Sequence, residues 1–133
     1  MSVKRSTPNM DYLSSELLAG AGVSQIVRTK DTVYFSGIVA ARGQGEVVAP
    51  GDVRGQLVFI LDVLRQCLAA EGLSFRNVAA TTLFCTDIEA VAQNASLFTE
   101  TFGEHPPTST WVEVRSLASK DYLAELLATA VID

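Results

Sequence analysis

The hydrophobic residues of this chain recur with two different periods, and each period predicts a different kind of element. After Asp52, apolar residues return every three or four positions, which predicts an amphipathic helix over residues 53–71 with Asp52 as its N-cap. Asp87 is the predicted cap of a second helix over residues 88–102. The apolar stripes of the two helices are expected to contain Leu57, Ile60, Leu61, Leu64, Cys67 and Leu68, and Val91, Ala95, Phe98 and Phe102.

The other apolar stretches are rich in β-branched and aromatic residues and predict strands. The first two of them are separated by the polar pair Lys30-Asp31, which predicts a β-hairpin. The element order β-β-(β)-α-β-α-β-β indicates an α+β fold with two helices on one face of a mixed sheet. The predicted strands cover residues 24–29, 32–37, 46–48, 78–86, 107–115 and 123–132.

The strand over residues 107–115 is expected to carry chemistry on one face and core on the other. Alternation places Ser109, Trp111, Glu113 and Arg115 on one side, and this side holds the single Trp of the chain. A solvated face explains such a mixture simply. An aromatic residue between a hydroxyl and a carboxylate also suits a pocket or a subunit contact, which we favour.

Length and composition indicate one domain over residues 1–133, with residues 1–19 as a loosely structured arm that contains a helical turn at 14–18. The chain is 48% hydrophobic and only 19% charged, which is apolar for a domain of this size. Because a small monomer has little room to hide so much apolar surface, we expect it to form an oligomer.

Charge and cysteine usage exclude several classes of protein. A net charge of −5 with scattered Lys and Arg argues against nucleic acid as the main partner. No apolar run is long enough for a signal peptide or a membrane span, so we expect a cytoplasmic protein without a membrane partner. Cys67 and Cys85 are expected to be buried and unpaired, and with the single His105 in a predicted turn they make a metal site improbable. A nucleophilic role for Cys85 is the minor alternative.

Glu125 is the one charged residue of the last predicted strand. Burying a carboxylate without a partner is costly, so this residue either reaches water at a sheet edge or serves a function or a subunit interface. Alternation places it with Leu123, Leu127, Thr129 and Val131, which is not a face suited to solvent. If Glu125 is buried, its pKa is expected to be raised, and it can hold or deprotonate a water molecule.

With these features in order, the chain resembles the Rid (YjgF-type) family of reactive-intermediate deaminases from about Ser24 onward. The resemblance lies in the order and spacing of several short motifs. They are Val23-Ser24-Gln25, Tyr34-Phe35-Ser36-Gly37, the long helix, Ala80-Thr81-Thr82-Leu83-Phe84-Cys85-Thr86-Asp87, Phe102-Gly103-Glu104-His105-Pro106, Val112-Glu113-Val114 and Glu125.

The resemblance implies a homotrimer with a chorismate-mutase-like fold and a pocket at each subunit boundary. It also implies hydrolysis of enamines or imines to a carbonyl compound and ammonia, without a metal or cofactor. In that family pattern, Ser36 and Gly37 match the pocket Ser-Gly pair, and Glu125 matches the glutamate that positions the attacking water.

The substrate-binding half of the family pattern differs in this chain. The arginine that binds the substrate carboxylate is replaced by Ser109, a Cys or Thr is replaced by Trp111, and the pocket tyrosine is replaced by Val23. A small acidic substrate is therefore expected to bind poorly, unless Arg115, or Arg28 of a neighbouring subunit, supplies a cation.

The resulting hypothesis is a cofactor-independent, deaminase-like hydrolase that acts on a small molecule with a C=N bond or an activated carbonyl group. The alternative is a trimeric metabolite-binding or regulatory protein without turnover. An endoribonuclease activity, sometimes attributed to such proteins, is disfavoured by the acidic charge. The environment of Glu125 should distinguish the first two: a water-accessible cleft shared with Ser36 and Trp111 favours catalysis, whereas a structural ion pair favours binding.

Overall fold

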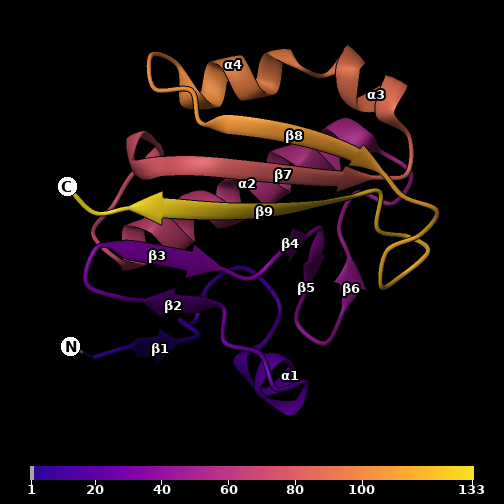
Figure 1. The fold of residues 1–133 in the computed structure, drawn as a ribbon. Helices are drawn as coiled ribbons and strands as arrows, with labels where there is room; N and C mark the ends of the chain where they lie inside the picture. The colour runs from indigo at the N-terminus through magenta and orange to yellow at the C-terminus, as the bar shows by residue number, and fades with distance from the viewer. Residues whose placement is uncertain (1) are drawn as a thin grey trace.

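The computed structural model describes residues 2–133, which form a mixed sheet of seven strands and a separate two-stranded ribbon (Figure 1). The strand order in the sheet is β1-β2-β3-β9-β7-β8, with β4 also paired to β9. The elements are β1 (Lys4–Ser6), α1 (Ser15–Gly20), β2 (Ile26–Arg28), β3 (Thr32–Phe35), β4 (Ile38–Val39), β5 (Ala41–Arg42), β6 (Glu46–Val47), α2 (Val53–Ala70), a 3₁₀ turn (Phe75–Asn77), β7 (Val78–Cys85), α3 (Ile88–Gln93), α4 (Ser96–Phe102), β8 (Thr108–Glu113) and β9 (Ala124–Val131).

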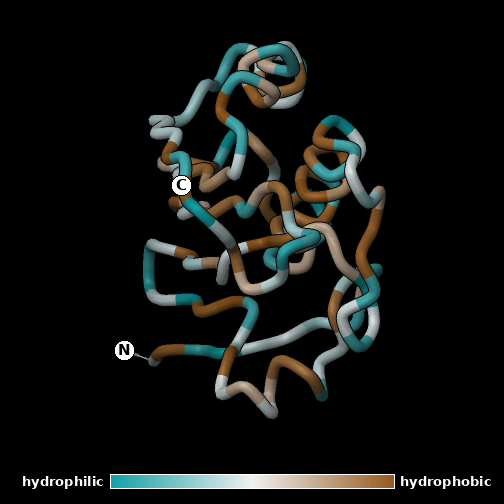
Figure 2. The backbone as a smooth tube through the Cα atoms, turned by 90° about the vertical axis from the view of Figure 1, so that its right-hand side faces the viewer, coloured by the Kyte–Doolittle hydropathy of each residue, from teal (hydrophilic) through white to brown (hydrophobic). Residues whose placement is uncertain are grey.

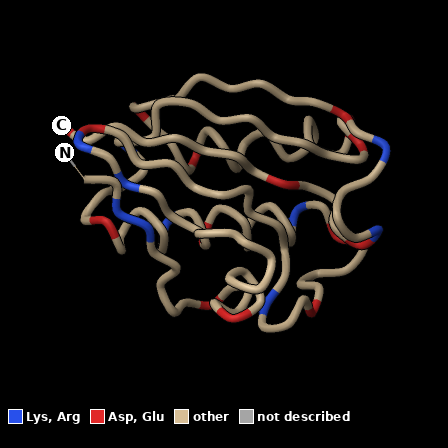
Figure 3. The backbone as a smooth tube through the Cα atoms, turned by 60° about the horizontal axis from the view of Figure 1, so that its bottom comes forward, with Lys and Arg blue, Asp and Glu red and all other residues tan. Residues whose placement is uncertain are grey.

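The predicted α+β class and the mixed sheet are confirmed. Strands β2 and β3 form the expected hairpin, and β7 and β8 pair in parallel, with α3 and α4 in the connection between them. The remaining pairs of the sheet are antiparallel. Charged residues are concentrated in turns and at chain ends, and the central strands are largely uncharged (Figure 3).

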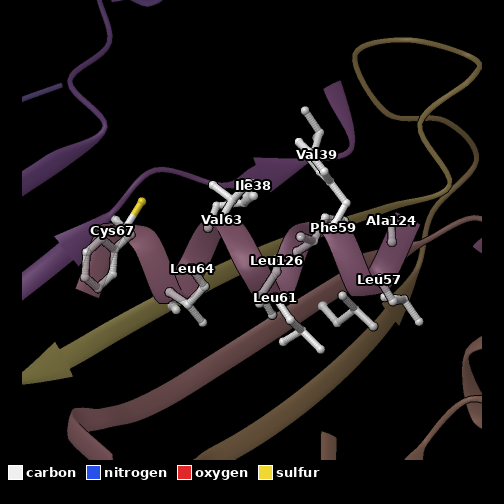
Figure 4. Packing of buried hydrophobic residues seen from close by; sticks show 14 of the residues in the cluster. Ile38, Val39, Leu57, Phe59, Leu61, Val63, Leu64, Cys67, Ala124 and Leu126 are labelled. Atoms are coloured by element: carbon white, nitrogen blue, oxygen red, sulfur yellow. The ribbon is translucent and has the colours of Figure 1, made fainter. Parts of the chain in front are cut away.

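The core lies between the sheet and α2, as the helical periodicity predicted (Figure 4). Asp52 caps α2 by accepting a hydrogen bond from Gly55 N at 2.9 Å. Gln56 is also fully buried, and its amide joins the helix to the loop before β9: Nε2 donates to Asp121 O at 3.0 Å, and Oε1 accepts from Leu123 N at 2.9 Å. This bridge fixes the start of β9.

The predicted helix over residues 88–102 is two helices, α3 and α4. Asn94 ends α3, and its side-chain amide donates to Ala90 O at 2.8 Å. Such local side-chain bonds compete with helix continuation. The sheet therefore carries α2, α3 and α4 on one face rather than two helices, and the short α1 lies apart from them (Figure 1).

The segment expected to be a loosely structured arm contains strand β1, which pairs with β2 in the register Lys4↔Arg28. Tyr12, in the same segment, is buried in the core. Neither feature follows from the sequence pattern, because both depend on contacts with distant parts of the chain rather than on local periodicity.

The face of the sheet opposite α2 is open and apolar, and we call it the open face. Viewed from the side, α2 lies on one side of the sheet while the other side is uncovered by helix over β3 and β9 (Figure 2). Its large exposed residues among those described are Tyr34 at 50%, Val112 at 37%, Leu127 at 42% and Val131 at 45%. Glu125 belongs to this face, since it shares its strand alternation with Leu127 and Val131.

The faces of β8 are reversed relative to the prediction. Ser109 and Trp111 point toward the helices, and Trp111 packs on Phe98 of α4 with ring centroids 5.9 Å apart. Val112, on the side expected to be core, is exposed on the open face. The charged members of the Trp111 side, Glu113 and Arg115, lie at the end of β8 and beyond it, where they do not oppose packing: Glu113 Oε1 accepts from Ile88 N at 2.9 Å.

Candidate functional site

Glu125 borders a cavity of about 430 Å³ between α1, the β3–β4 junction and the loop before β9, which we call the carboxylate cavity. Its walls are mostly apolar, and no Lys, Arg, His or Asp lines it among the described residues. The lining residues are Tyr12, Leu13, Leu17, Leu18, Ala21, Val23, Gln25, Ser36, Gly37, Val39, Ala118, Tyr122 and Glu125. The predicted site residues Val23, Ser36, Gly37 and Glu125 are thus brought together.

The Glu125 carboxylate is partly buried and has neither a hydrogen bond nor an ion pair with the described part of the chain. Its backbone is fixed by pairing with Phe84 on β7 and with Val39 on β4. Burial raises the pKa of this carboxyl group above its ordinary value. A carboxylate fixed in position and left without a protein partner is free to hold a water molecule or a substrate proton.

Gly37 provides the surface on which the carboxylate rests. A Cβ atom at this position would collide with Glu125 Oε2 and lie 2.9 Å from its Cδ. Because Gly37 has no side chain, the Glu125 carboxylate can pack directly against the Gly37 backbone. The Ser-Gly pair and Glu125 form one packed unit.

Ser36 is held by three hydrogen bonds that orient it toward the cavity. Its Oγ donates to Ser24 O at 2.7 Å, its backbone N donates to Gln25 O at 2.9 Å, and Gln25 Nε2 donates to its carbonyl oxygen at 3.1 Å. Because the hydroxyl proton is used on Ser24, Ser36 can accept a hydrogen bond from a ligand but has no second proton to donate.

Two tyrosines in the carboxylate cavity were missed at the sequence level. Tyr122 precedes Glu125 by three positions, and Tyr12 comes from the N-terminal segment. Nothing in the spacing of Tyr12 relative to Glu125 pointed to their proximity. Together they give the cavity aromatic walls near Val23, the position at which the family pattern has its tyrosine.

Ser109 and Trp111 lie in a different cavity, of about 330 Å³, on the helix side of the sheet. We call it the aromatic cavity, since Phe98, Phe102 and Trp111 form much of its wall. Its full lining is Thr81, Leu83, Phe98, Thr99, Phe102, Gly103, Pro106, Pro107, Ser109, Trp111 and Leu126. Within one chain, the expected cleft shared by Glu125, Ser36 and Trp111 does not form.

Neither of the two arginines considered as substitute cations lines either cavity within the chain. Arg115 lies in the loop after β8. Arg28 is engaged elsewhere, since its Nη1 donates to the Glu71 carbonyl at 3.0 Å and to Glu71 Oε1 at 3.2 Å. Among residues 2–133, no Lys or Arg lines the cavity that contains Ser109.

The remaining candidates do not adjoin the carboxylate cavity. Cys85 is buried, and burial raises the pKa of its thiol, which disfavours the reactive thiolate. Burial likewise raises the pKa of Cys67 to about 12. His105 is exposed in the turn after α4.

Within residues 2–133, no cluster of three or more His, Cys, Asp or Glu side chains suits a metal ion, and no helix is long and apolar enough to span a bilayer.

Comparison with known proteins agrees with this arrangement. Residues 14–132 match the family described as endoribonuclease L-PSP. The chain belongs to this family, which is the YjgF or Rid family. The whole length that carries the sheet and the carboxylate cavity, apart from the N-terminal segment, falls inside the match.

Named relatives include two deaminases. The chain is 33% identical over 103 residues to TdcF of Escherichia coli, named as a reactive intermediate deaminase, covering 74% of this chain and 78% of that protein. It is 27% identical over 103 residues to the 3-aminoacrylate deaminase RutC of Acinetobacter baylyi, covering 77% and 81%. A YjgF/YER057c/UK114 family structure from Mycobacterium tuberculosis superposes with a TM-score of 0.81 at 23% identity, covering 98% of this chain and 100% of that one, which shows the shared fold.

Proposed function

We propose that this protein is a cofactor-independent, deaminase-like hydrolase that acts on an enamine, an imine or a related activated carbonyl compound. The observation that carries the proposal is the Glu125 carboxylate, which lies unpaired in a mostly apolar cavity against Gly37. An ion pair at Glu125 would have favoured a structural role, and none is formed with the described residues. The relatives named as deaminases point to the same class of reaction.

In the proposed reaction, Glu125 orients a water molecule toward the carbon of a C=N bond and accepts a proton as the oxygen attacks. The proton then passes to the nitrogen. As the resulting carbinolamine collapses, its hydroxyl proton passes to the nitrogen, the C–N bond breaks, and ammonia and a carbonyl compound are released. Each imine consumes one water molecule, so the step needs no oxidant or reductant. Burial raises the pKa of Glu125, which makes its carboxylate a better proton acceptor than an exposed glutamate.

The proposed substrate is larger, flatter or less acidic than a small amino-acid-derived imine. A charge-assisted bond from arginine to carboxylate contributes about 1.5 to 3 kcal/mol, so Ser109 in its place weakens binding of an acid roughly ten- to a hundredfold. The aromatic cavity beside Ser109 instead offers apolar surface from Phe98 and Trp111.

We further propose that three chains assemble through the open face, where Tyr34, Leu127 and Val131 are exposed. Assembly would cover this apolar surface. Because the two cavities lie on opposite sides of the sheet within one chain, the proposal is that the aromatic cavity of one chain meets the carboxylate cavity of its neighbour at the edge of this contact. Light scattering is expected to give a mass of about three chains. A monomer at micromolar concentration would leave the two cavities separate and contradict the shared site.

The alternative proposal is a metabolite-binding or regulatory protein of the same fold without turnover. Two observations favour it: no Lys or Arg of the described residues lines the cavity beside Ser109, and both cavities have mostly apolar linings. The two cysteines, Cys67 and Cys85, are buried and form no disulfide, which is typical of proteins in a reducing compartment. We therefore propose that the protein is located in the cytoplasm.

The test is a panel of imines generated in situ by amino-acid oxidation, with small, branched and aromatic side chains, each as the free acid and as the amide. Release of the carbonyl product is followed against spontaneous hydrolysis. Faster hydrolysis of aromatic or uncharged members is expected. Hydrolysis at the spontaneous rate throughout, together with a shift in melting temperature by one member, would support the binding alternative instead.

A further inference from the structure

Tyr12 lies outside the family match, which begins at residue 14, yet its side chain is only 4% exposed. Its hydroxyl reaches the junction of β3 and β4. There it accepts a hydrogen bond from Val39 N at 3.1 Å and lies 3.5 Å from Gly37 O, to which it donates. The phenol therefore joins both ends of the segment from Gly37 to Val39.

The same two residues determine where the Glu125 carboxylate lies. Val39 is the strand partner of Glu125 in the β4–β9 pair, and Gly37 is the residue against which the carboxylate packs. Burial raises the pKa of Tyr12 above its usual range, and the negative charge of Glu125 raises it further. The hydroxyl thus stays protonated beside Glu125 and keeps the proton that it donates to Gly37.

The chain segment around Tyr12 is itself held in place. Gly43 N donates to Tyr12 O at 3.1 Å, and Ser14 N donates to Gly43 O at 2.8 Å. Arg42 adds an ion pair with Asp11, with Nε 2.6 Å from Oδ1. The phenol is therefore presented from a segment anchored on both sides.

We infer that Tyr12 is a positioning residue for Glu125: its hydroxyl fixes the Gly37–Val39 backbone, and this backbone sets the place of the carboxylate. The importance of that position for turnover rests on the proposed function. The position itself can be measured without any substrate.

The experiment follows the Glu125 side-chain carboxyl by ¹³C NMR during a pH titration of wild type and Tyr12→Phe. Besides Glu125, the titratable groups lining the cavity are Tyr12 and Tyr122. Thr101→Val is the control, since it removes a hydroxyl that donates to a backbone carbonyl, Leu97 O at 2.6 Å, in α4 and away from the carboxylate cavity. Tyr12→Phe is expected to lower the Glu125 midpoint by about half a pH unit, because a looser backbone admits water to the carboxylate. Thr101→Val should leave it unchanged.

Hydrogen exchange separates positioning from general stability. The Val39 amide loses its acceptor in Tyr12→Phe and should exchange about tenfold faster or more, while amides in α2 keep their rates. Faster exchange at Val39 with an unchanged Glu125 midpoint would overturn the inference, because Tyr12 would then act on the backbone alone.

A second variant keeps the test decisive if Tyr12→Phe folds poorly. p-Aminophenylalanine at position 12 retains the ring and a group that can both donate and accept, so it should restore the wild-type Glu125 midpoint. A midpoint that remains displaced overturns the inference. If imines are turned over, Tyr12→Phe should lower kcat about tenfold with little change in KM.

The outcomes also separate this inference from the proposed function. Coupling of Tyr12 to Glu125 in a protein without turnover refutes the function and leaves the inference standing. Wild-type kcat in Tyr12→Phe, with an unchanged midpoint, refutes the inference and leaves the function standing.

Discussion

The two cavities lie on opposite faces of one sheet and offer opposite chemistry. The carboxylate cavity holds Glu125 against Gly37, with Ser36 beside them. The aromatic cavity holds Trp111 against Phe98, with a serine where the family pattern has a cation. The carboxylate cavity can accept a proton from water or a substrate, whereas the aromatic cavity can bind an apolar group.

The separation follows from strand register. Leu83 of β7 pairs with both Trp111 and Leu126, whereas its neighbour Phe84 pairs with Glu125. Paired residues share a face, and consecutive residues alternate, so Trp111 and Glu125 must lie on opposite sides. A substrate that contacts both therefore requires a second chain, which makes assembly part of the proposed chemistry.

The largest effect is expected for Glu125→Gln, which keeps the shape of the side chain but removes the ability of the carboxylate cavity to accept a proton. Turnover is expected to fall by on the order of 10² to 10⁴. The melting temperature should stay close to wild type, because Glu125 has no ionic partner among the described residues to leave unpaired. Imine hydrolysis and thermal melting on the same preparation measure both effects.

Glu100→Gln, in α4 and exposed, is the matched control and should change neither quantity. A melting temperature lowered by the equivalent of about 3 to 5 kcal/mol would instead reveal a buried ion pair formed in the assembly, and would end the catalytic interpretation. An active Glu125→Gln protein would move the chemistry to another part of the cavity.

Gly37→Ala should produce a smaller loss of activity by moving the carboxylate rather than removing it. The added Cβ would collide with Glu125 Oε2, so the side chain must turn away. We expect a rate loss of about ten- to a hundredfold and a destabilisation of about 1 to 3 kcal/mol. Kinetics and denaturant unfolding measure them.

Gly20→Ala is the matched control, because a Cβ there meets nothing within 4 Å. It should retain activity and unfold at an equal or slightly higher denaturant concentration. Full activity in Gly37→Ala would show that the exact place of the carboxylate does not matter.

Features that depend on local chemistry were predictable from the sequence. Asp52 and Asp87 cap helices as expected, since each carboxylate accepts from a backbone N three residues ahead. The alternation of β9 correctly placed Glu125 with Leu127 and Val131. The Ser-Gly pair was linked to Glu125 through the family resemblance, and the structure brings all three residues to one cavity.

Features that depend on distant packing were not predictable. Alternation defines two sides of β8 but not which side the helices cover, so the Trp111 side was mistaken for the one opposite the core. Asn94 interrupts the second helix through one side-chain bond that leaves apolar periodicity intact. Tyr12 reaches Val39 across 27 residues of sequence, and no local pattern encodes that contact.

Ser109→Arg tests whether the aromatic cavity lacks only a cation to bind an acidic substrate. It restores a planar cationic donor for carboxylate, so hydrolysis of a small acidic enamine such as 2-aminoacrylate, through its imine tautomer, should improve about tenfold, mainly through KM. Ser109→Lys is the control, since it supplies charge without the planar fork and should gain less. Efficient hydrolysis of 2-aminoacrylate by wild type would show that another cation reaches the substrate.

The smallest expected effect is the pH dependence that Glu125 gives to folding. Its pKa is raised in the folded protein by burial. Between the ordinary glutamate value, 4.5, and the raised one, the folded state therefore binds more protons than the unfolded state. Stability contributed by the protonated group is present below this window and is lost as pH rises through it.

Glu125→Gln lacks this titration, so the melting temperature of wild type relative to Glu125→Gln should decline as the pH rises through the window. The change should be small, because Glu125 is only partly buried and solvent screens its charge. Turnover should run the other way, since kcat/KM needs the unprotonated carboxylate and should rise over the same pH range. The opposite outcome is a difference in melting temperature between the two proteins that does not change with pH, together with a kcat/KM that is constant over the same pH range. It would show that the cavity does not raise the pKa of Glu125.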